Sequence, residues 1–206
     1  MSQSTSSPYH GFKQKLQDFA KGQQGIRNPF VIAAVDPQIE HRVASRLESW
    51  ASDRKVNSEI PSGMDIKPVR LDELLPQTDV YKLLVDLGGA MTDLDGDRTA
   101  NERVKQTMQD RLAREIVQQI IESELTEEQL ESQSCVVLLL NLGSLYPFTR
   151  ASELLDELDR RNVKSTIGIP FPGNIVSGSL SFFDGESRRY YPAHQIDGRI
   201  QEEDLQ

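Results

Sequence analysis

Hydrophobic residues form one continuous run near the middle of the chain. Residues 136–140 read Val-Val-Leu-Leu-Leu, with polar residues on either side. A run of this length without alternation predicts a strand that is covered on both faces, as in a parallel sheet. Weaker apolar segments predict further strands at 30–35, 64–69 and 165–169. Because Pro68 cannot donate to a sheet ladder, the strand at 64–69 is expected at an edge or with an irregular path.

Apolar residues at helical spacing predict amphipathic helices between these strands. The expected inward stripes are Phe12, Leu16 and Phe19; Ile39, Val43, Leu47 and Trp50; Val104, Met108, Leu112, Ile116 and Ile120; and Leu154, Leu155 and Leu158. Asp36 and Pro37 are expected to cap and open the second of these helices, and Pro147 to lie in the first turn of the last, with Glu157 facing solvent. A short helix is predicted at 80–87, and a hairpin at 180–191 that turns at Asp184-Gly185.

Strands that alternate with helices predict a single three-layer α/β domain with a mainly parallel sheet and a C-terminal β-hairpin. The 206 residues suffice for one well-buried core and are few for two. We assign residues 1–8 to a disordered tail, 9–197 to this domain and 198–206 to a C-terminal tail that frays after Gly198. The order of elements also resembles that of nucleotide-binding folds.

The segment after the first strand decides whether such a fold could hold a nucleotide. A phosphate cradle needs glycines for close backbone approach, and a P-loop also needs a lysine. Here the chain reads Ala34-Val35-Asp36-Pro37-Gln38, and Asp36 places a carboxylate where phosphate oxygens would lie. The sequence therefore disfavours an ATPase and leaves open a P-loop-like fold without its phosphate loop. A nucleotide or other small ligand at the carboxyl end of the sheet stays an alternative.

Charge and composition restrict the remaining function classes. A net charge of -9 without a visible basic stripe argues against strong direct nucleic-acid binding. No apolar run is long enough to cross a bilayer and the N-terminus lacks a signal-peptide pattern, so we expect a cytoplasmic protein. Asp93, Asp95 and Asp97 resemble the start of a calcium loop, but Arg98 and Val104 stand where that loop needs glycine and glutamate. We therefore assign no catalytic residue, metal site or cofactor.

Aromatic, proline and arginine side chains cluster after the central strand. Tyr146, Pro147 and Arg150 combine residue types that are common in protein interfaces. Phe171-Pro172-Gly173 is expected to follow the next strand, and parallel strands end at one edge of a sheet. Tyr146 and Arg150 are thus expected near Asp36 or near Phe171-Pro172-Gly173. These two clusters form our candidate partner-binding site, and a purely structural role for Tyr146 and Arg150 is the alternative.

The same stretches resemble a known family. Residues 143–150, Gly-Ser-Leu-Tyr-Pro-Phe-Thr-Arg, and Leu154-Leu155-Asp156-Glu157-Leu158 resemble the G-x-x-(Y/F)-P-F-x-R…LL-x-x-L signature of the BrxB proteins of bacteriophage-exclusion (BREX) systems. Phe171-Pro172-Gly173, Ser-Leu-Ser-Phe-Phe at 179–183 and Tyr190-Tyr191 resemble the FPG…SL-x-LF…YY ending of that family. The chain departs from the pattern at Ile175 and Val176, where an aromatic residue is common.

The resemblance implies a non-catalytic accessory or assembly subunit of a phage-defence complex. In that family, a small protein of this kind works beside a PglZ-type phosphatase-like protein, a large ATPase and a site-specific methyltransferase. The PglZ-type protein is the implied partner, and the large BREX ATPase is a further candidate. No membrane partner is implied, and the oligomeric state is left open.

Overall fold

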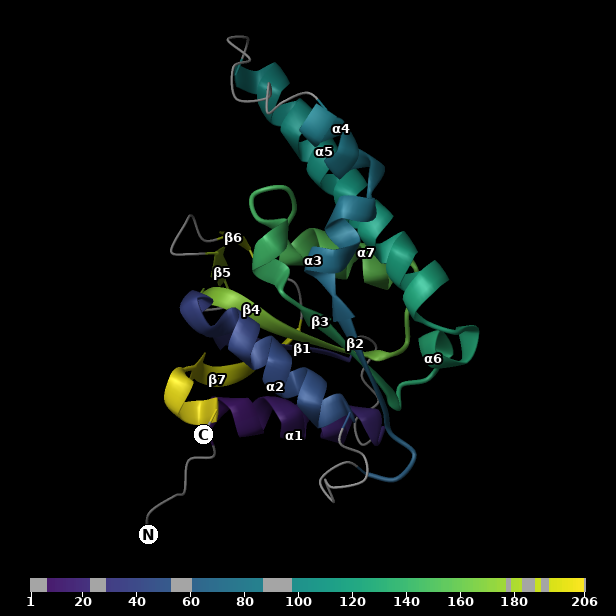
Figure 1. Ribbon diagram of the computed structural model, residues 1–206, viewed down its shortest axis with the longest axis vertical. Coiled ribbons are helices and arrows are strands. Elements are labelled where there is room, and N and C mark those ends of the chain that lie inside the picture. The colour runs from purple at the N-terminus through teal and green to yellow at the C-terminus, as the bar shows by residue number, and fades with distance from the viewer. Residues whose placement is uncertain are drawn as a thin grey trace.

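A five-stranded parallel sheet forms the centre of the protein (Figure 1). The computed structural model describes residues 7–22, 29–52, 61–86, 98–176, 179–182, 188–189 and 193–205. The strands are β1 (Phe30–Val35), β2 (Asp65–Arg70), β3 (Cys135–Leu140), β4 (Thr166–Val176) and β7 (His194–Ile200), in the order β2-β3-β4-β1-β7. Each neighbouring pair is parallel, which confirms the predicted α/β class.

Side chains of the central strands alternate between two apolar layers, because successive residues of a strand point to opposite faces. In β1, Phe30 and Ile32 join one buried cluster, whereas Val31, Ala33 and Val35 join the other. The residues of β3 divide in the same way, and all six are buried. Burial on both faces explains the continuous apolar run in the sequence of this strand.

Helices cover both faces of the sheet (Figure 1). One layer contains α1 (Pro8–Ala20), the 3-10 turn η1 (Pro37–Ile39), α2 (Glu40–Ser52) and the 3-10 turn η6 (Glu202–Leu205). The other contains α3 (Leu71–Leu74), η2 (Leu75–Gln77), α4 (Asp79–Asp86), α5 (Arg98–Gln119), the π-helical turn η4 (Ile120–Glu124), α6 (Glu127–Glu131), η5 (Leu142–Leu145) and α7 (Ala151–Arg160). The predicted three-layer arrangement is thereby confirmed.

The turn into α2 forms as its sequence predicts. The Asp36 carboxylate accepts a hydrogen bond of 3.0 Å from the Gln38 N–H, and Pro37 opens the turn. Further along α2, Val43, Leu47 and Trp50 are buried against the sheet. This geometry directs α2 back over β1 and fixes Glu40 at its first turn.

β2 is an edge strand, as the proline in its sequence predicts. It pairs only with β3 among the described strands, with Pro68 opposite Leu138. Pro68 lacks an N–H, and an edge strand needs ladder donors on one side only.

α5 extends beyond the sheet, with α4 beside it (Figure 1). Leu112, Ile116 and Ile120 are buried as predicted. Val104 was expected to point inward, but its side chain is 47% exposed because this half of the helix runs past the core. None of the helices in the described ranges, α5 included, is long and apolar enough to cross a membrane.

β7 corrects the expectation that the chain frays after Gly198. The strand pairs with β1, with Val31 opposite His194 and Val35 opposite Ile200. Ile200 and Leu205 are buried in the α1 and α2 layer. Most positions of β7 are polar and several are exposed, so its sequence lacks the apolar pattern that predicts a strand.

The N-terminal boundary also differs slightly from its prediction. Residues 1–6 lie outside the described part, while the Ser7 side chain caps α1 and Pro8 is the first helical residue. α1 therefore begins before residue 9. The assignment of residues 9–197 to one domain stays a prediction.

β4 continues beyond the parallel sheet into an antiparallel extension. Its last residues pair with β5 (Ser179–Phe182), with Gly173 opposite Phe182, and β5 pairs with β6 (Arg188–Arg189). This pairing agrees with the predicted C-terminal hairpin. The expected turn at Asp184-Gly185 lies outside the described residues.

Candidate functional site

The carboxyl ends of β1 and β3 lie at one edge of the sheet, on either side of β4, as the parallel order of the strands predicts. Asp36 directly follows β1, and Asn141 directly follows β3. Glu40 lies at the start of α2, and its Oε1 accepts a hydrogen bond of 2.8 Å from the Gly143 N–H of η5. Asp36 and Gly143 therefore lie at the same edge.

The Glu40–Gly143 contact occupies the position where open α/β sheets commonly bind ligands. Such sites lie where connections leave the sheet toward opposite faces. β1 and β3 flank β4; β1 leads to α2 on one face, whereas β3 leads to η5 and α7 on the other. The hydrogen bond joins these two connections, so a backbone N–H that could serve a phosphate is taken by a carboxylate of the chain itself.

The environment of Glu40 disfavours the ionised form of its carboxyl group. Burial raises its pKa above the usual value, and the nearby charge of Asp72 raises it further. The hydrogen bond from Gly143 opposes both effects because it favours the ionised acceptor.

A second carboxylate at this edge behaves in the opposite way. Asp72 accepts a hydrogen bond of 2.9 Å from Arg70 Nη2 and another of 2.9 Å from Asn141 Nδ2. Burial raises the pKa of Asp72, but the hydrogen bonds and the charge of Arg70 outweigh burial and hold it below the usual value. Arg70 also lies 3.5 Å from Glu48 of α2. This network links β2, α3, the end of β3 and α2.

Asp36 is paired with Arg199, an arginine outside the predicted site. Arg199 of β7 places Nη2 3.4 Å from Asp36 Oδ1 and donates from Nη1 to Asn174 Oδ1 at 3.2 Å. Among the described residues, Arg199 is the cation that pairs with Asp36, and Arg150 forms no ion pair with it. The sequence gives no signal for this pair, because the mostly polar residues around Arg199 predict a tail and not a strand.

The loop of Tyr146, Pro147 and Phe148 lies between η5 and α7 and is held by contacts from α4 and α5. The Pro147 carbonyl accepts a hydrogen bond of 3.1 Å from Gln109 Nε2, and the Thr149 hydroxyl donates to the Gln109 carbonyl at 3.2 Å. Thr149 and Gln109 are buried, and the Phe148 ring lies edge-on to Tyr81 with ring centres 6.1 Å apart. The loop is thus held against α4 and α5.

Three of the six predicted site residues lie on this loop and at its end. Tyr146 is 49% exposed, Pro147 is exposed and Arg150 is half-buried. The Tyr146–Pro147 peptide bond is cis. Pro147 does not open the helix as predicted, because α7 begins only at Ala151 with Arg150 at its N-cap position.

Arg150 lies close to the first turn of α7. Burial raises the pKa of Glu153, and the charge of Arg150 partly offsets that effect. Further along α7, Glu157 was expected to face solvent but is buried; it forms ion pairs of 2.7 Å with Arg160 and 3.0 Å with Arg161. A buried carboxylate needs such partners, and the two arginines one turn later supply them.

The other three predicted site residues lie inside the sheet. Phe171, Pro172 and Gly173 are buried within β4 instead of forming a loop after it. Ala34 and Val35 of β1 lie opposite Phe171 and Pro172 in the parallel pairing. The structure therefore separates the six candidates into an accessible loop and a buried strand segment.

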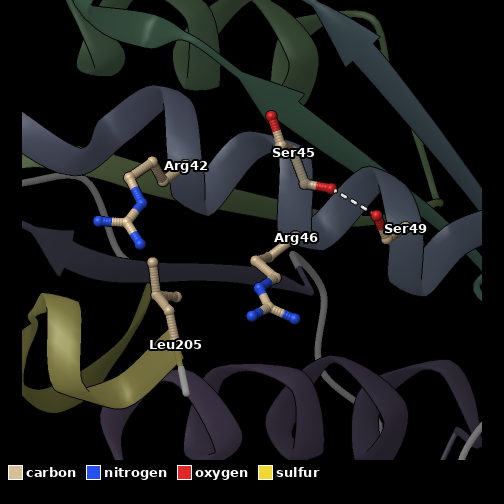
Figure 2. Close-up of a pocket in the computed structure, with 5 residues that line it drawn as sticks. All are labelled: Arg42, Ser45, Arg46, Ser49 and Leu205. Atoms are coloured by element: carbon tan, nitrogen blue, oxygen red, sulfur yellow. Dashed lines mark hydrogen bonds between the residues drawn. The ribbon is translucent and has the colours of Figure 1, made fainter.

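A shallow hollow of about 370 Å³ lies away from these residues, between α2 and η6 (Figure 2). Figure 2 shows Arg42 and Arg46 extending from α2 toward η6 and α1, with Leu205 between them. Arg42 is paired with Glu202, and the Ser49 hydroxyl donates to a carbonyl of its own helix. With acidic residues of η6 beside it, this hollow fits a structural contact better than an anion site.

The fold and this site define an α/β protein with a parallel sheet. At the carboxyl end of the sheet, the Asp36 and Glu40 carboxylates accept the hydrogen bonds of the Gln38 and Gly143 N–H groups. The exposed loop that carries Tyr146 and ends at Arg150 leaves the same edge. The family model described as BREX protein BrxB matches residues 77–196. The chain belongs to this family and is a component of a BREX phage-defence system. No curated protein and no solved structure matches the chain.

Proposed function

We propose that this protein is a non-catalytic assembly subunit of a BREX complex, and that a PglZ-type protein binds to the loop of Tyr146, Pro147 and Arg150. Family membership supports the BREX setting. The ordered loop with its exposed tyrosine supports a role in binding a partner protein.

The observation that carries this proposal is an exposed tyrosine on a loop that is otherwise held in place. Tyr146 is 49% exposed, whereas Thr149 and Gln109 beneath the loop are buried and hydrogen-bonded to it. A loop that is already ordered loses little conformational entropy on binding. Tyrosine and arginine contribute most often to the few contacts that dominate binding free energy.

The carboxylates at the carboxyl edge of the sheet are the reason that we propose no nucleotide chemistry for this protein. Asp36 caps η1 and pairs with Arg199, and Glu40 takes the Gly143 N–H. A nucleotide phosphate there would meet two carboxylates and would have to displace at least one of them.

Co-purification with the other products of the BREX operon tests the proposal. Tyr146→Ala and Arg150→Ala are expected to abolish recovery of the PglZ-type protein while the melting temperature stays within about 2 °C of wild type. Arg46→Ala is the matched control, because it removes an exposed guanidinium from the other face of the sheet. Full recovery with both loop variants would reject this loop as the binding site. Recovery of the large BREX ATPase alone would change the partner.

Ligand melting tests the alternative of a nucleotide sensor. ATP, ADP, GTP, Mg²⁺ and Ca²⁺ are expected to leave the melting temperature unchanged. A bound ligand at 100 times its Kd stabilises a protein by roughly 2.7 kcal/mol, which such a measurement detects easily. A shift of that size with a nucleotide, removed by a substitution at the carboxyl edge, would favour the sensor.

A further inference from the structure

The outward face of α5 carries a row of polar and basic side chains. Spacings of four, four, three and four residues place five positions on one side of a helix. All five are exposed: Arg103, Thr107, Arg111, Arg114 and Gln118. The opposite side of α5 packs against the body through Leu112, Ile116 and Val117.

The charge of this segment of α5 is opposite to that of the whole chain. Residues 103–119 contain four cations, Arg103, Lys105, Arg111 and Arg114, and two carboxylates, Asp110 and Glu115, although the full chain has a net charge of -9. Glu115 is already engaged, since it pairs with Arg111 at 2.9 Å and accepts from the Val80 N–H at 3.0 Å. Arg103 and Arg114 have no carboxylate partner among the described residues.

Exposed apolar side chains accompany these charges on the same projecting part of the molecule. α4 lies beside α5 in this projecting part (Figure 1). Val104 of α5 is 47% exposed, and Leu83 and Val85 of α4 are 44% and 58% exposed. Three of the four large apolar side chains that stand exposed in the described ranges thus lie on α4 and α5. Arginine combined with apolar contact area is typical of protein interfaces.

From this combination we infer that the outward face of α5 binds an acidic amphipathic helix of another BREX protein, an inference that rests on the proposed assembly role. Arg103 and Arg114 are about 17 Å apart along the helix, at 1.5 Å per residue, which corresponds to about three turns of a partner helix. Carboxylates of that helix meet the arginines, and its apolar side meets Val104, which lies next to Arg103 on α5. Nucleic acid fits less well, since three arginines give few phosphate contacts and phosphates do not cover apolar side chains.

The test compares two double charge reversals in the full chain, each mixed with the individually purified products of the same BREX operon. Arg103→Glu/Arg114→Glu is expected to weaken the affinity of one complex about tenfold or more, while the melting temperature stays that of wild type. The loss of affinity should be strongest at low salt. Lys21→Glu/Arg46→Glu makes the same change of net charge on exposed positions of the opposite layer and is expected to leave affinity unchanged. Arg103→Lys/Arg114→Lys is expected to retain most of the affinity, because the charge is kept.

Hydrogen exchange and a DNA titration complete the test. In the wild-type complex, α5 residues 103–118 are expected to gain protection. A complex that forms normally with Arg103→Glu/Arg114→Glu would overturn this inference and leave the proposed function standing. A wild-type protein that binds none of the operon's products would overturn both. Submicromolar binding of wild-type protein to duplex DNA that only this variant loses would replace the acidic helix by nucleic acid.

Discussion

Glu40 and Gly143 are joined by a hydrogen bond of 2.8 Å, although they belong to connections that leave the sheet toward opposite faces. The bond fixes the start of α2 against η5, and η5 leads directly into the loop that presents Tyr146. The position of the exposed loop therefore depends on a contact at the carboxyl edge.

Substitution of Glu40 separates the hydrogen bond from the charge. Glu40→Ala leaves the Gly143 N–H without its acceptor and is expected to cost about 1–3 kcal/mol. Glu40→Gln keeps an acceptor oxygen and removes a charge that is costly to bury, so its cost should be clearly smaller. Urea unfolding at pH 7 measures both, and equal losses would contradict the role given to the hydrogen bond.

The same site predicts a specific pH dependence. Because the pKa of Glu40 is raised in the folded state, that state holds the proton more tightly than the unfolded chain. The contribution of Glu40 to wild-type stability should therefore decrease as pH rises from the usual pKa of glutamate through the raised one. Glu40→Gln lacks this titration, so its stability should gain on that of wild type across the window. A constant difference between the two curves would count against the raised pKa.

Asp72 is expected to show the opposite trend. Its folded-state pKa is lowered, so its contribution is present above the usual pKa of aspartate and is lost as pH falls through the lowered value. Asp72→Asn should destabilise by about 1 kcal/mol at pH 7, and the difference from wild type should shrink in acid. Acid titration of unfolding, repeated in high salt to screen Arg70, checks both points.

The buried carboxylate of α7 depends on two arginines. Arg160→Ala/Arg161→Ala leaves Glu157 buried without a cation and is expected to cost about 1–2 kcal/mol, less than for a fully buried pair because both arginines are largely exposed. Each single substitution should cost less than half of that, since the other arginine remains. A triple variant that adds Glu157→Gln should recover part of the loss in thermal unfolding.

Substitutions of two glycines in β4 are expected to disturb different parts of the structure. A Cβ at Gly173 would lie 2.1 Å from the Ser181 carbonyl oxygen, so Gly173→Ala should separate β4 from β5 and speed hydrogen exchange in residues 179–182. A Cβ at Gly168 would lie 2.9 Å from methyl groups of Leu16 and Leu138 in the core. Gly168→Ala should therefore lower the global unfolding free energy, by about 1–3 kcal/mol. Reversed patterns in hydrogen exchange would refute this assignment.

Elements with strong local signals were predicted well. The apolar run of β3, the cap and proline before α2 and the proline in β2 each impose one structure on the backbone. The edge that holds Asp36 and Gly143 followed from the parallel order of the strands. The first three features depend on short stretches of sequence, and the shared edge follows from the alternation of strands and helices along the chain.

Features that depend on distant parts of the chain were missed. Phe171-Pro172-Gly173 reads as a turn, yet β4 continues there because its ladder with β3 stops at Gly168, and a strand bonded on fewer sides tolerates proline. Val104 continues the apolar stripe of α5, and the sequence does not show that the core ends before it. Arg199 lies on a strand whose polar sequence gave no signal, so its pairing with Asp36 could not be expected.

The positions of β4 and β7 give β1 neighbours that are distant in sequence. β1 consists of residues 30–35, yet both of its neighbours, β4 and β7, come from residues 166–200. Contacts of such sequence separation form slowly, because a long loop must close before they gain anything. The six-residue apolar β1 thus stays unpaired until β4 joins one of its sides and β7 the other, so the docking of these two strands is expected to limit the rate of folding.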